Sequence, residues 1–143
     1  MANKYDCLKI ENQLCFPLYA ASREVIKQYN PYLQKIDLTY TQYVAMMVLW
    51  DVKKTTVKDL GEKLYLDSGT LTPLLKSLEA KGLVTRSRSK EDERVLIVEI
   101  TAKGEELKNE AVEIPKAMMG CVKLTQEEAA TLYSLLYKVL GNL

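Results

Sequence analysis

The stretch from Thr56 to Ile100 limits the possible folds of this 143-residue chain more than any other. Thr56 is a favourable helix N-cap, and Asp59 follows three residues later, which is the spacing of a capping box. The segment 57–64 therefore predicts a short helix. A second helix is predicted over 68–81, because four leucines share one of its faces. They are Leu71, Leu74, Leu75 and Leu78.

A hairpin is predicted after the second helix. Gly82 is placed to end that helix, since glycine adopts the left-handed conformation common after helix C-termini. Two strand-like runs come next, Leu83–Arg86 and Val95–Ile100, and the polar loop Ser87–Arg94 joins them. Helix, turn, helix and β-hairpin is the order of a winged helix-turn-helix. We therefore predict a mainly α-helical fold with a small β-hairpin wing, the winged helix-turn-helix spanning residues 41–100.

Two helices are predicted before this segment. Leu8–Tyr29 has apolar residues at helical spacing, and it either kinks at Pro17 or begins near Leu14. Asn30-Pro31 should stop it, because the residue before a proline avoids the helical region. Thr41–Val52 is apolar on most sides and should be buried.

Two more helices are predicted after the hairpin. Thr101 should cap a long helix over 102–121, which Pro115 should bend or break. Thr125 and Glu128 have the spacing of a capping box and should begin the last helix.

The whole chain, 1–143, is interpreted as one domain. The helices within 8–30 and 102–143 each keep an apolar stripe that must be buried somewhere. The stripes either pack on each other within one subunit or join two copies, and we favour a homodimer.

Composition excludes several classes of protein. The chain has no histidine, and its three cysteines are scattered. An ordinary zinc site, histidine-based catalysis and a disulfide framework are therefore excluded, and we expect no cofactor. No apolar run approaches the roughly 20 residues of a membrane span, and the polar N-terminus does not resemble a signal peptide. We expect a cytoplasmic protein.

The exposed face of the second helix has the side chains of a DNA-reading helix. Small hydroxyl groups near a helix N-terminus reach base edges in the major groove, and the first-turn N–H groups hold phosphate. The candidates are Ser68, Thr70, Thr72 and Lys76, with Lys81 as a further phosphate neutraliser. Propensity alone would place the N-cap at Thr72, before Pro73, but we adopt a start at Ser68.

The hairpin adds a basic patch to a chain whose net charge is only +1. Its cations are Arg86, Arg88 and Lys90, with no acid among them. Arg94 should insert into a narrow minor groove, oriented by Asp92. On charge alone, a solvated loop is an equally open interpretation. The order of elements together with the basic wing favours double-stranded DNA as the partner.

Cys15 is the candidate reactive group. Tyr19 lies one helical turn after it, and five of the nine tyrosines fall between Tyr19 and Tyr43. Phenols can donate hydrogen bonds to a thiolate, lower the thiol pKa and so favour oxidation to sulfenic acid. The alternative is that a lone cysteine on an apolar helical face is an inert small hydrophobe.

Four stretches make the chain resemble the MarR family of winged-helix repressors, and within it the organic hydroperoxide resistance regulators (OhrR). They are Gln13–Phe16 within Leu8–Tyr29, Leu38–Tyr43, Leu66–Leu75 and Glu91–Arg94. The last two are typical of the whole family, and the first is typical of its thiol-sensing branch. The resemblance covers nearly the whole chain. It implies a homodimeric repressor on a pseudo-palindromic operator, dimerised through its first and last helices.

The resemblance also implies roles for single residues. Cys15 would be the peroxidatic thiol, and its phenolic neighbours would be Tyr19 together with Tyr29 and Tyr40 of the partner subunit. An organic hydroperoxide, in an apolar pocket beside Phe16, would oxidise Cys15, release the DNA and derepress peroxide-resistance genes.

Two redox modes exist in this family. One-cysteine members cap the sulfenic acid with a low-molecular-weight thiol, whereas two-cysteine members form an intersubunit disulfide. Cys121 lies about where the second thiol would be, so a disulfide between Cys15 and Cys121 of the partner subunit is our hypothesis. We assign no role to Cys7.

Two other functions stay open. A MarR-type repressor relieved by a small phenolic or anionic ligand would not need Cys15. A thiol peroxidase is disfavoured by the small size, the basic wing and the lack of a catalytic histidine or active-site arginine near Cys15. We therefore predict a regulator and not an enzyme.

Overall fold

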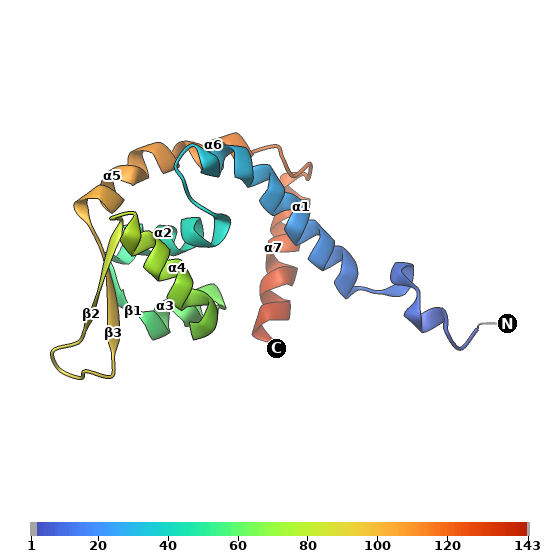
Figure 1. Ribbon diagram of the computed structural model, residues 1–143. Helices are drawn as coiled ribbons and strands as arrows, with labels where there is room; N and C mark the ends of the chain where they lie inside the picture. The colour runs from blue at the N-terminus through green and yellow to red at the C-terminus, as the bar shows by residue number, and fades with distance from the viewer. Residues whose placement is uncertain (1–2, 143) are drawn as a thin grey trace. The chain divides into compact units, whose positions relative to one another are not determined.

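The computed structural model describes residues 3–142. The chain divides into two compact units. One is Tyr29–Lys116, here called the central unit, and the other combines the chain up to Gln28 with the chain from Ala117 onward (Figure 1). Within residues 3–142, no helix is both long and apolar enough to cross a membrane.

The central unit consists of helices around a small antiparallel sheet. Its helices are the end of α1 (Cys15–Gln34), then α2 (Tyr40–Val52), α3 (Val57–Leu64), α4 (Ser68–Ala80), α5 (Ala102–Ala111) and most of α6 (Glu113–Met118). Its strands are β1 (Lys54–Thr56), β2 (Val84–Arg88) and β3 (Leu96–Ile100). The sheet has the order β1-β3-β2, with both outer strands antiparallel to β3. The predicted fold class, mainly α-helical with a hairpin wing, is confirmed.

The core of the central unit is formed by α2, α3, α4 and the sheet. As predicted, α2 is largely buried, and Ala45, Met46 and Leu49 have no exposed surface. The leucine face of α4 is also buried, with Leu78 at 0%, and β3 contributes Val98 at 0%. Burying each of the larger side chains stabilises the fold by about 1.5–3 kcal/mol.

The helix-turn-helix begins where the sequence predicts. Thr56 caps α3 by accepting a hydrogen bond from the N–H of Asp59 at 3.1 Å. Gly61 is required where α3 meets α4, because a Cβ there would lie 2.8 Å from both Leu66 O and Leu71 Cδ1. This close approach fixes the angle at which α4 leaves the turn.

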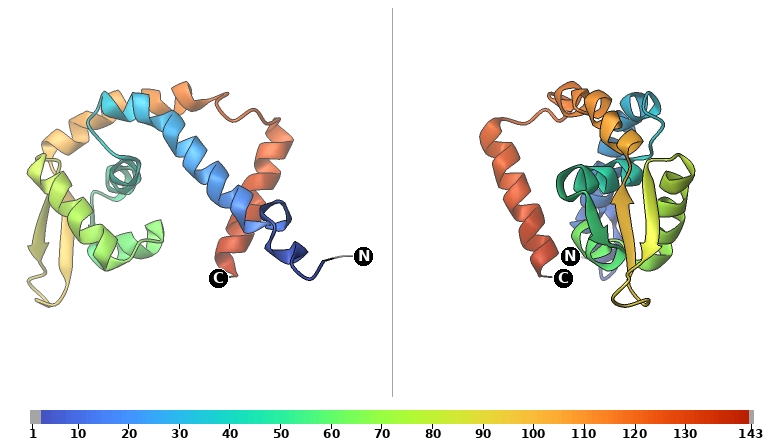
Figure 2. Two further views of the ribbon diagram at one scale, coloured as in Figure 1. Left: turned by 45° about the vertical axis from the view of Figure 1, so that its right-hand side comes forward. Right: turned by 90° about the vertical axis from the view of Figure 1, so that its left-hand side faces the viewer.

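The hairpin is longer than predicted, and it projects beyond the helices of the central unit (Figure 2). β2 continues to Arg88, which pairs with Leu96, so the connecting loop is 89–95 and not Ser87–Arg94. β1 was not predicted, because three residues are too few to show an alternating pattern. Its residue Thr55 pairs with Val98 and covers the second edge of β3.

Helix α1 begins later than the first predicted residue. It starts at Cys15, which agrees with the alternative of a start near Leu14. Pro17 then falls in the first turn, where an absent N–H leaves no helical hydrogen bond unmade. Two 3₁₀ turns, Asp6–Leu8 and Ile10–Asn12, precede it.

The prediction that Asn30-Pro31 ends α1 is wrong. The helix continues to Gln34 with Pro31 inside it. Leu33 in this last turn is 1% exposed, and burying such a side chain is worth about 1.5–3 kcal/mol. A proline inside a helix costs about 3 kcal/mol, and the burial of Leu33 offsets much of that cost.

The helix predicted over 102–121 is broken in two, as Pro115 led us to expect. α5 ends at Ala111, and α6 covers Glu113–Met118, so the helical part stops short of Cys121. Pro115 is the third residue of α6, a position whose N–H needs no helical partner.

Both predicted caps of the C-terminal helices are confirmed. Thr101 accepts the N–H of Gly104 at 3.1 Å at the start of α5. Thr125 and Glu128 form a complete capping box at the start of α7 (Gln126–Gly141), with hydrogen bonds of 3.1 and 3.0 Å.

Candidate nucleic-acid interface and reactive thiol

The N-terminal half of α4 presents a small polar face to solvent. Asp67 is its N-cap, and the N–H of Thr70 donates to the Asp67 carboxylate at 2.8 Å, which lowers the pKa of Asp67. The start at Ser68 is thus confirmed, and Thr72 is not the cap but donates to the carbonyl of Ser68 at 2.9 Å. The exposed side chains of this half include Ser68, Thr70 and Thr72, and Lys76 is exposed one turn after Thr72. We call them the reading face.

Arg94 is a cation of the wing whose side chain is 90% exposed. Its Nε and Nη2 donate to the two carboxylate oxygens of Asp92 at 3.1 and 3.3 Å, and its backbone N–H donates to Asp92 Oδ1 at 3.0 Å. These hydrogen bonds lower the pKa of Asp92. The predicted contact between Asp92 and Arg94 is therefore present. Arg88 and Lys90 are also exposed on the hairpin.

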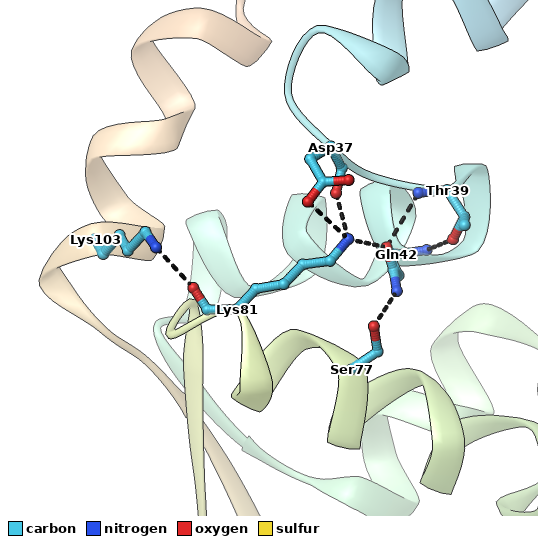
Figure 3. Close-up of polar contacts among 6 residues, drawn as sticks. All are labelled: Asp37, Thr39, Gln42, Ser77, Lys81 and Lys103. Atoms are coloured by element: carbon cyan, nitrogen blue, oxygen red, sulfur yellow. Dashed lines mark hydrogen bonds and ion pairs between the residues drawn. The ribbon is translucent and has the colours of Figure 1, made fainter.

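Two predicted phosphate contacts are engaged inside the protein instead. The Arg86 side chain is 19% exposed and donates through Nε and Nη2 to Glu79 at 3.3 and 3.1 Å, which lowers the pKa of Glu79. The Lys81 ammonium donates to the carbonyl of Asp37 and, at 3.2 Å, to Gln42 Oε1 (Figure 3). It also lies 3.6 Å from the Asp37 carboxylate. Two of its three donors are therefore used inside the protein, and the Asp37 carboxylate offsets its charge, so Lys81 is poorly placed to hold phosphate.

A cavity of about 980 Å³ lies between α3, the start of α4 and the wing. Its lining includes the apolar Val57, Leu66 and Leu71 and the polar Lys58, Ser68 and Arg94. The sequence did not reveal it, because its walls come from segments that are far apart in the chain. Because Ser68 and Arg94 also belong to the predicted DNA contacts, an occupant would compete with DNA.

Cys15 is exposed at the first residue of α1, and its thiol is free. The hydroxyl of Tyr19, one turn later, accepts a hydrogen bond from Arg23 Nη1 at 3.2 Å. The Arg23 guanidinium also lies 5.5 Å from the centroid of the Tyr19 ring. Cys15, Tyr19 and Arg23 are spaced by four residues and so share one side of α1. Sequence reasoning missed Arg23, although this spacing was visible.

Tyr29 and Tyr40 meet in the central unit. Their ring centroids are 5.0 Å apart in an edge-to-face arrangement, and Tyr43 joins them at 6.0 and 6.3 Å. Burial, and then the neighbouring phenol of Tyr29, raises the pKa of Tyr40 above its ordinary value of 10.0. The pKa of Tyr43 is raised for the same reasons. The phenols of Tyr40 and Tyr43 therefore keep their protons, and can donate hydrogen bonds, at neutral pH.

The terminal helices expose much apolar surface. On α7, five large apolar or aromatic side chains are between 44 and 65% exposed. They are Leu132, Tyr133, Leu135, Tyr137 and Val139. Phe16 and Leu18 of α1 are 45 and 46% exposed. Cys121 and Cys7 are exposed free thiols.

A helix-turn-helix with an exposed polar reading face, followed by a protruding hairpin with an exposed arginine, defines a winged-helix DNA-binding protein. Proteins similar to this chain belong to the same class. The family of transcriptional regulators SarA/Rot matches residues 27–111. Over all 143 residues, the chain is 52% identical to the organic hydroperoxide resistance transcriptional regulator of Bacillus subtilis, and it covers 97% of that protein.

Solved structures of regulators are also similar. Reduced AbfR bound to DNA matches with a TM-score of 0.79 and 34% identity over 98% of both chains; AbfR has also been solved from Staphylococcus epidermidis. The overoxidised form of AbfR bound to DNA matches with a TM-score of 0.78 and 32% identity over 98% of both chains. The disulfide form matches with a TM-score of 0.68 and 32% identity over 97% of this chain and 95% of that one. A mutant MarR from E. coli with operator DNA matches at 0.83 and 26% identity, over 97% of this chain and 99% of that one.

The chain belongs to the MarR family of winged-helix transcriptional regulators, in its branch of organic hydroperoxide resistance regulators. It is a regulator and not an enzyme.

Proposed function

We propose that this chain is a cytoplasmic, redox-sensing repressor that binds a pseudo-palindromic operator as a homodimer. Oxidation of Cys15 by an organic hydroperoxide releases the DNA and derepresses peroxide-resistance genes. The observation that carries the proposal is the exposed Cys15 at the start of α1, followed on the same side by Tyr19, in a chain 52% identical to an organic hydroperoxide regulator.

DNA recognition is assigned to α4 and the wing. The reading face of α4 enters the major groove, and Arg94, held by Asp92 at 3.1 Å, enters the neighbouring minor groove. Arg88 and Lys90 supply further positive charge on the exposed hairpin. Arg86 and Lys81 contribute indirectly, because their side chains fasten α4 to the wing and to α2.

The homodimer is supported by the apolar surface of the terminal helices. Side chains such as Leu135 of α7, 53% exposed, would be buried in a two-fold interface. Two copies of α4 about one helical turn of DNA apart, roughly 34 Å, would then read a pseudo-palindrome. A single copy of α4 reads only one half-site.

The proposed chemistry starts with attack of the Cys15 thiolate on the hydroperoxide. The sulfur attacks the peroxide oxygen, the O–O bond breaks, and the products are a sulfenic acid and an alcohol. A second thiol then attacks the sulfenic sulfur and expels water, which forms a disulfide. Tyr19, and Tyr29 and Tyr40 of the partner subunit, donate hydrogen bonds to the reacting sulfur.

We propose Cys121 of the partner subunit as the second thiol. Its side chain is exposed, as that reaction requires. AbfR has been solved on DNA in both reduced and overoxidised forms, and separately in a disulfide form. This pattern favours the disulfide as the product that releases DNA. A low-molecular-weight thiol in place of Cys121 is the one-cysteine alternative.

A second candidate function is relief by a small phenolic or anionic ligand. The cavity between α3, α4 and the wing favours it, since an occupant would contact both Ser68 and Arg94. A Cys15→Ser protein that still leaves DNA when the inducer is added would support this second function.

The test is a gel shift on the promoter DNA of the gene that encodes this protein, with reduced, hydroperoxide-treated and Cys15→Ser protein. We expect reduced protein to bind, treated protein to release the DNA, and the serine variant to stay bound throughout. Equal binding by treated and reduced protein would refute peroxide sensing, and equal release by the serine variant would remove Cys15 from the mechanism.

A further inference from the structure

Gln42 is the one polar side chain within residues 3–142 that is buried, at 6% exposure. Its Oε1 accepts the backbone N–H of Thr39 at 3.1 Å and the Lys81 ammonium at 3.2 Å. Its Nε2 donates to Ser77 Oγ at 2.9 Å (Figure 3). A single amide thus joins the N-cap of α2 to two residues at the far end of α4.

The contacts of Gln42 reach α4 at its C-terminal end. Ser77 lies in the last turn of α4 and Lys81 is its C-cap. From the other side, Lys103 of α5 donates to the carbonyl of Lys81 at 2.9 Å. Three of the four reading-face residues, Ser68, Thr70 and Thr72, lie in the N-terminal half of the helix. Because a helix is a stiff rod, a displacement of these anchors at one end is transmitted to the reading face.

Adjacent residues in the first turn of α2 make contacts in two different directions. Tyr40 and Tyr43 contact Tyr29 at 5.0 and 6.0 Å, whereas Gln42 contacts α4. Gln42 also closes the capping box with Thr39, so it cannot move independently of this turn. A shift of the phenols must therefore displace the amide that holds α4.

We propose that Gln42 is a positioning residue that couples the Tyr29–Tyr40–Tyr43 cluster to the recognition helix α4. The coupling rests on the proposed function, in which these phenols respond to oxidation of Cys15. In reduced protein, the hydrogen bonds of Gln42 hold Ser77 and Lys81 so that the reading face has its DNA-binding position. When Tyr40 moves, the turn carries Gln42 with it, and α4 leaves that position.

The directional contacts of Gln42 explain why a polar residue occupies this buried place. The Lys81 side chain is only 27% exposed, and its ammonium needs acceptors from Gln42 and Asp37. If Gln42 is displaced, the partly buried Lys81 ammonium loses one of its acceptors. A small movement of α2 is therefore unfavourable unless α4 moves with it. An apolar residue would provide packing but no such linkage.

The test compares operator affinity, measured by fluorescence anisotropy, for reduced and hydroperoxide-treated protein. The variants are Gln42→Met, which keeps volume but removes all three hydrogen bonds, and Ser77→Ala, which removes only the contact to Ser77. Gln42→Glu is the conservative variant, because both oxygens accept and the Ser77 hydroxyl can turn to donate. Glu105→Gln, which weakens the exposed Lys53–Glu105 pair at the other end of α2, is the control.

Coupling between two sites is typically about 5- to 150-fold in affinity, and we expect wild type and Glu105→Gln to show a loss of that size on oxidation. Gln42→Met should bind more weakly when reduced, and its ratio of oxidised to reduced dissociation constants should fall towards one. Ser77→Ala should lie between, and Gln42→Glu should keep the wild-type ratio. Thermal unfolding of each variant shows that it is folded at the assay temperature.

A purely structural role would lower the melting temperature of Gln42→Met but leave its ratio equal to that of wild type, and this result would overturn the coupling. Unchanged reduced-state affinity in Gln42→Met would overturn the positioning of α4. If wild type itself shows a ratio of one, peroxide sensing fails, and the coupling fails with it.

Discussion

Replacing Gly104 by alanine tests how α5 is packed against the rest of the central unit. In an unhindered helix, this change stabilises by about 0.5–1 kcal/mol. At Gly104, however, a Cβ would lie 2.3 Å from the carbonyl oxygen of Leu83 and 2.7 Å from Cγ1 of Ile100. The carbonyl belongs to the backbone and cannot rotate away, so α5 must move off the sheet.

The size of the effect follows from the contacts that this movement breaks. Overpacking in a core costs about 1–3 kcal/mol. Trp50 Nε1 donates to the Gly104 carbonyl at 2.8 Å, and the loss of that hydrogen bond costs about 0.5–1.5 kcal/mol. After the helix-propensity gain is subtracted, Gly104→Ala should lower the free energy of unfolding by about 1–3 kcal/mol.

The assay is urea unfolding followed by circular dichroism and by tryptophan fluorescence, for which Trp50 is the only reporter in the chain. Gly141→Ala in α7 is the matched control, because its Cβ would meet nothing within 4 Å. The control should keep its midpoint or raise it slightly, while Gly104→Ala should unfold earlier and with altered Trp50 emission. A Gly104→Ala protein as stable as wild type would refute the close packing of α5 on the sheet.

Three other predictions concern DNA, pH and the thiols. Arg94→Ala should weaken operator binding by about 1–3 kcal/mol, as for a groove contact, and unchanged anisotropy titrations would remove the wing tip from the recognition surface. The contribution of protonated Tyr40 to the free energy of unfolding should be fully present below pH 10.0. It should be lost as the pH rises through the raised pKa of Tyr40, because the folded state then holds a proton that the unfolded state releases. Urea unfolding between about pH 9 and 11 should show a shallower fall for Tyr40→Phe, and equal slopes would contradict the burial of this phenol. After treatment with cumene hydroperoxide, non-reducing electrophoresis should show a covalent dimer that Cys15→Ser and Cys121→Ser both lack, and a persistently monomeric wild-type band would exclude the disulfide.

Elements governed by local pattern could be predicted from the sequence. Helices α3 and α4 and the caps at Thr56, Thr101 and Thr125 depend on residues within one turn of each other, and all are present. The end of α1 could not be predicted in this way. Pro31 favours a stop locally, but the burial of Leu33 in the core decides the outcome.

The candidate site was predictable in composition but not in its internal pairing. The exposed reading face and the contact of Asp92 with Arg94 are local, two to four residues apart, and both are present. Lys81, by contrast, is engaged by a residue 44 positions away, and no spacing in the sequence indicates that partner. A basic residue next to a recognition helix therefore looks like a DNA contact until its tertiary partners are known.

The most direct test of peroxide sensing follows operator release and Cys15 oxidation in one reaction. Reduced protein bound to fluorescent operator DNA is mixed with one equivalent of organic hydroperoxide, anisotropy is recorded, and quenched samples are analysed by mass spectrometry for the state of Cys15. We expect the DNA to be released no faster than the Cys15 thiol disappears, and to be released completely once Cys15 is in a disulfide. Cys15 fully converted to a disulfide on protein that still holds its operator would contradict the proposed function.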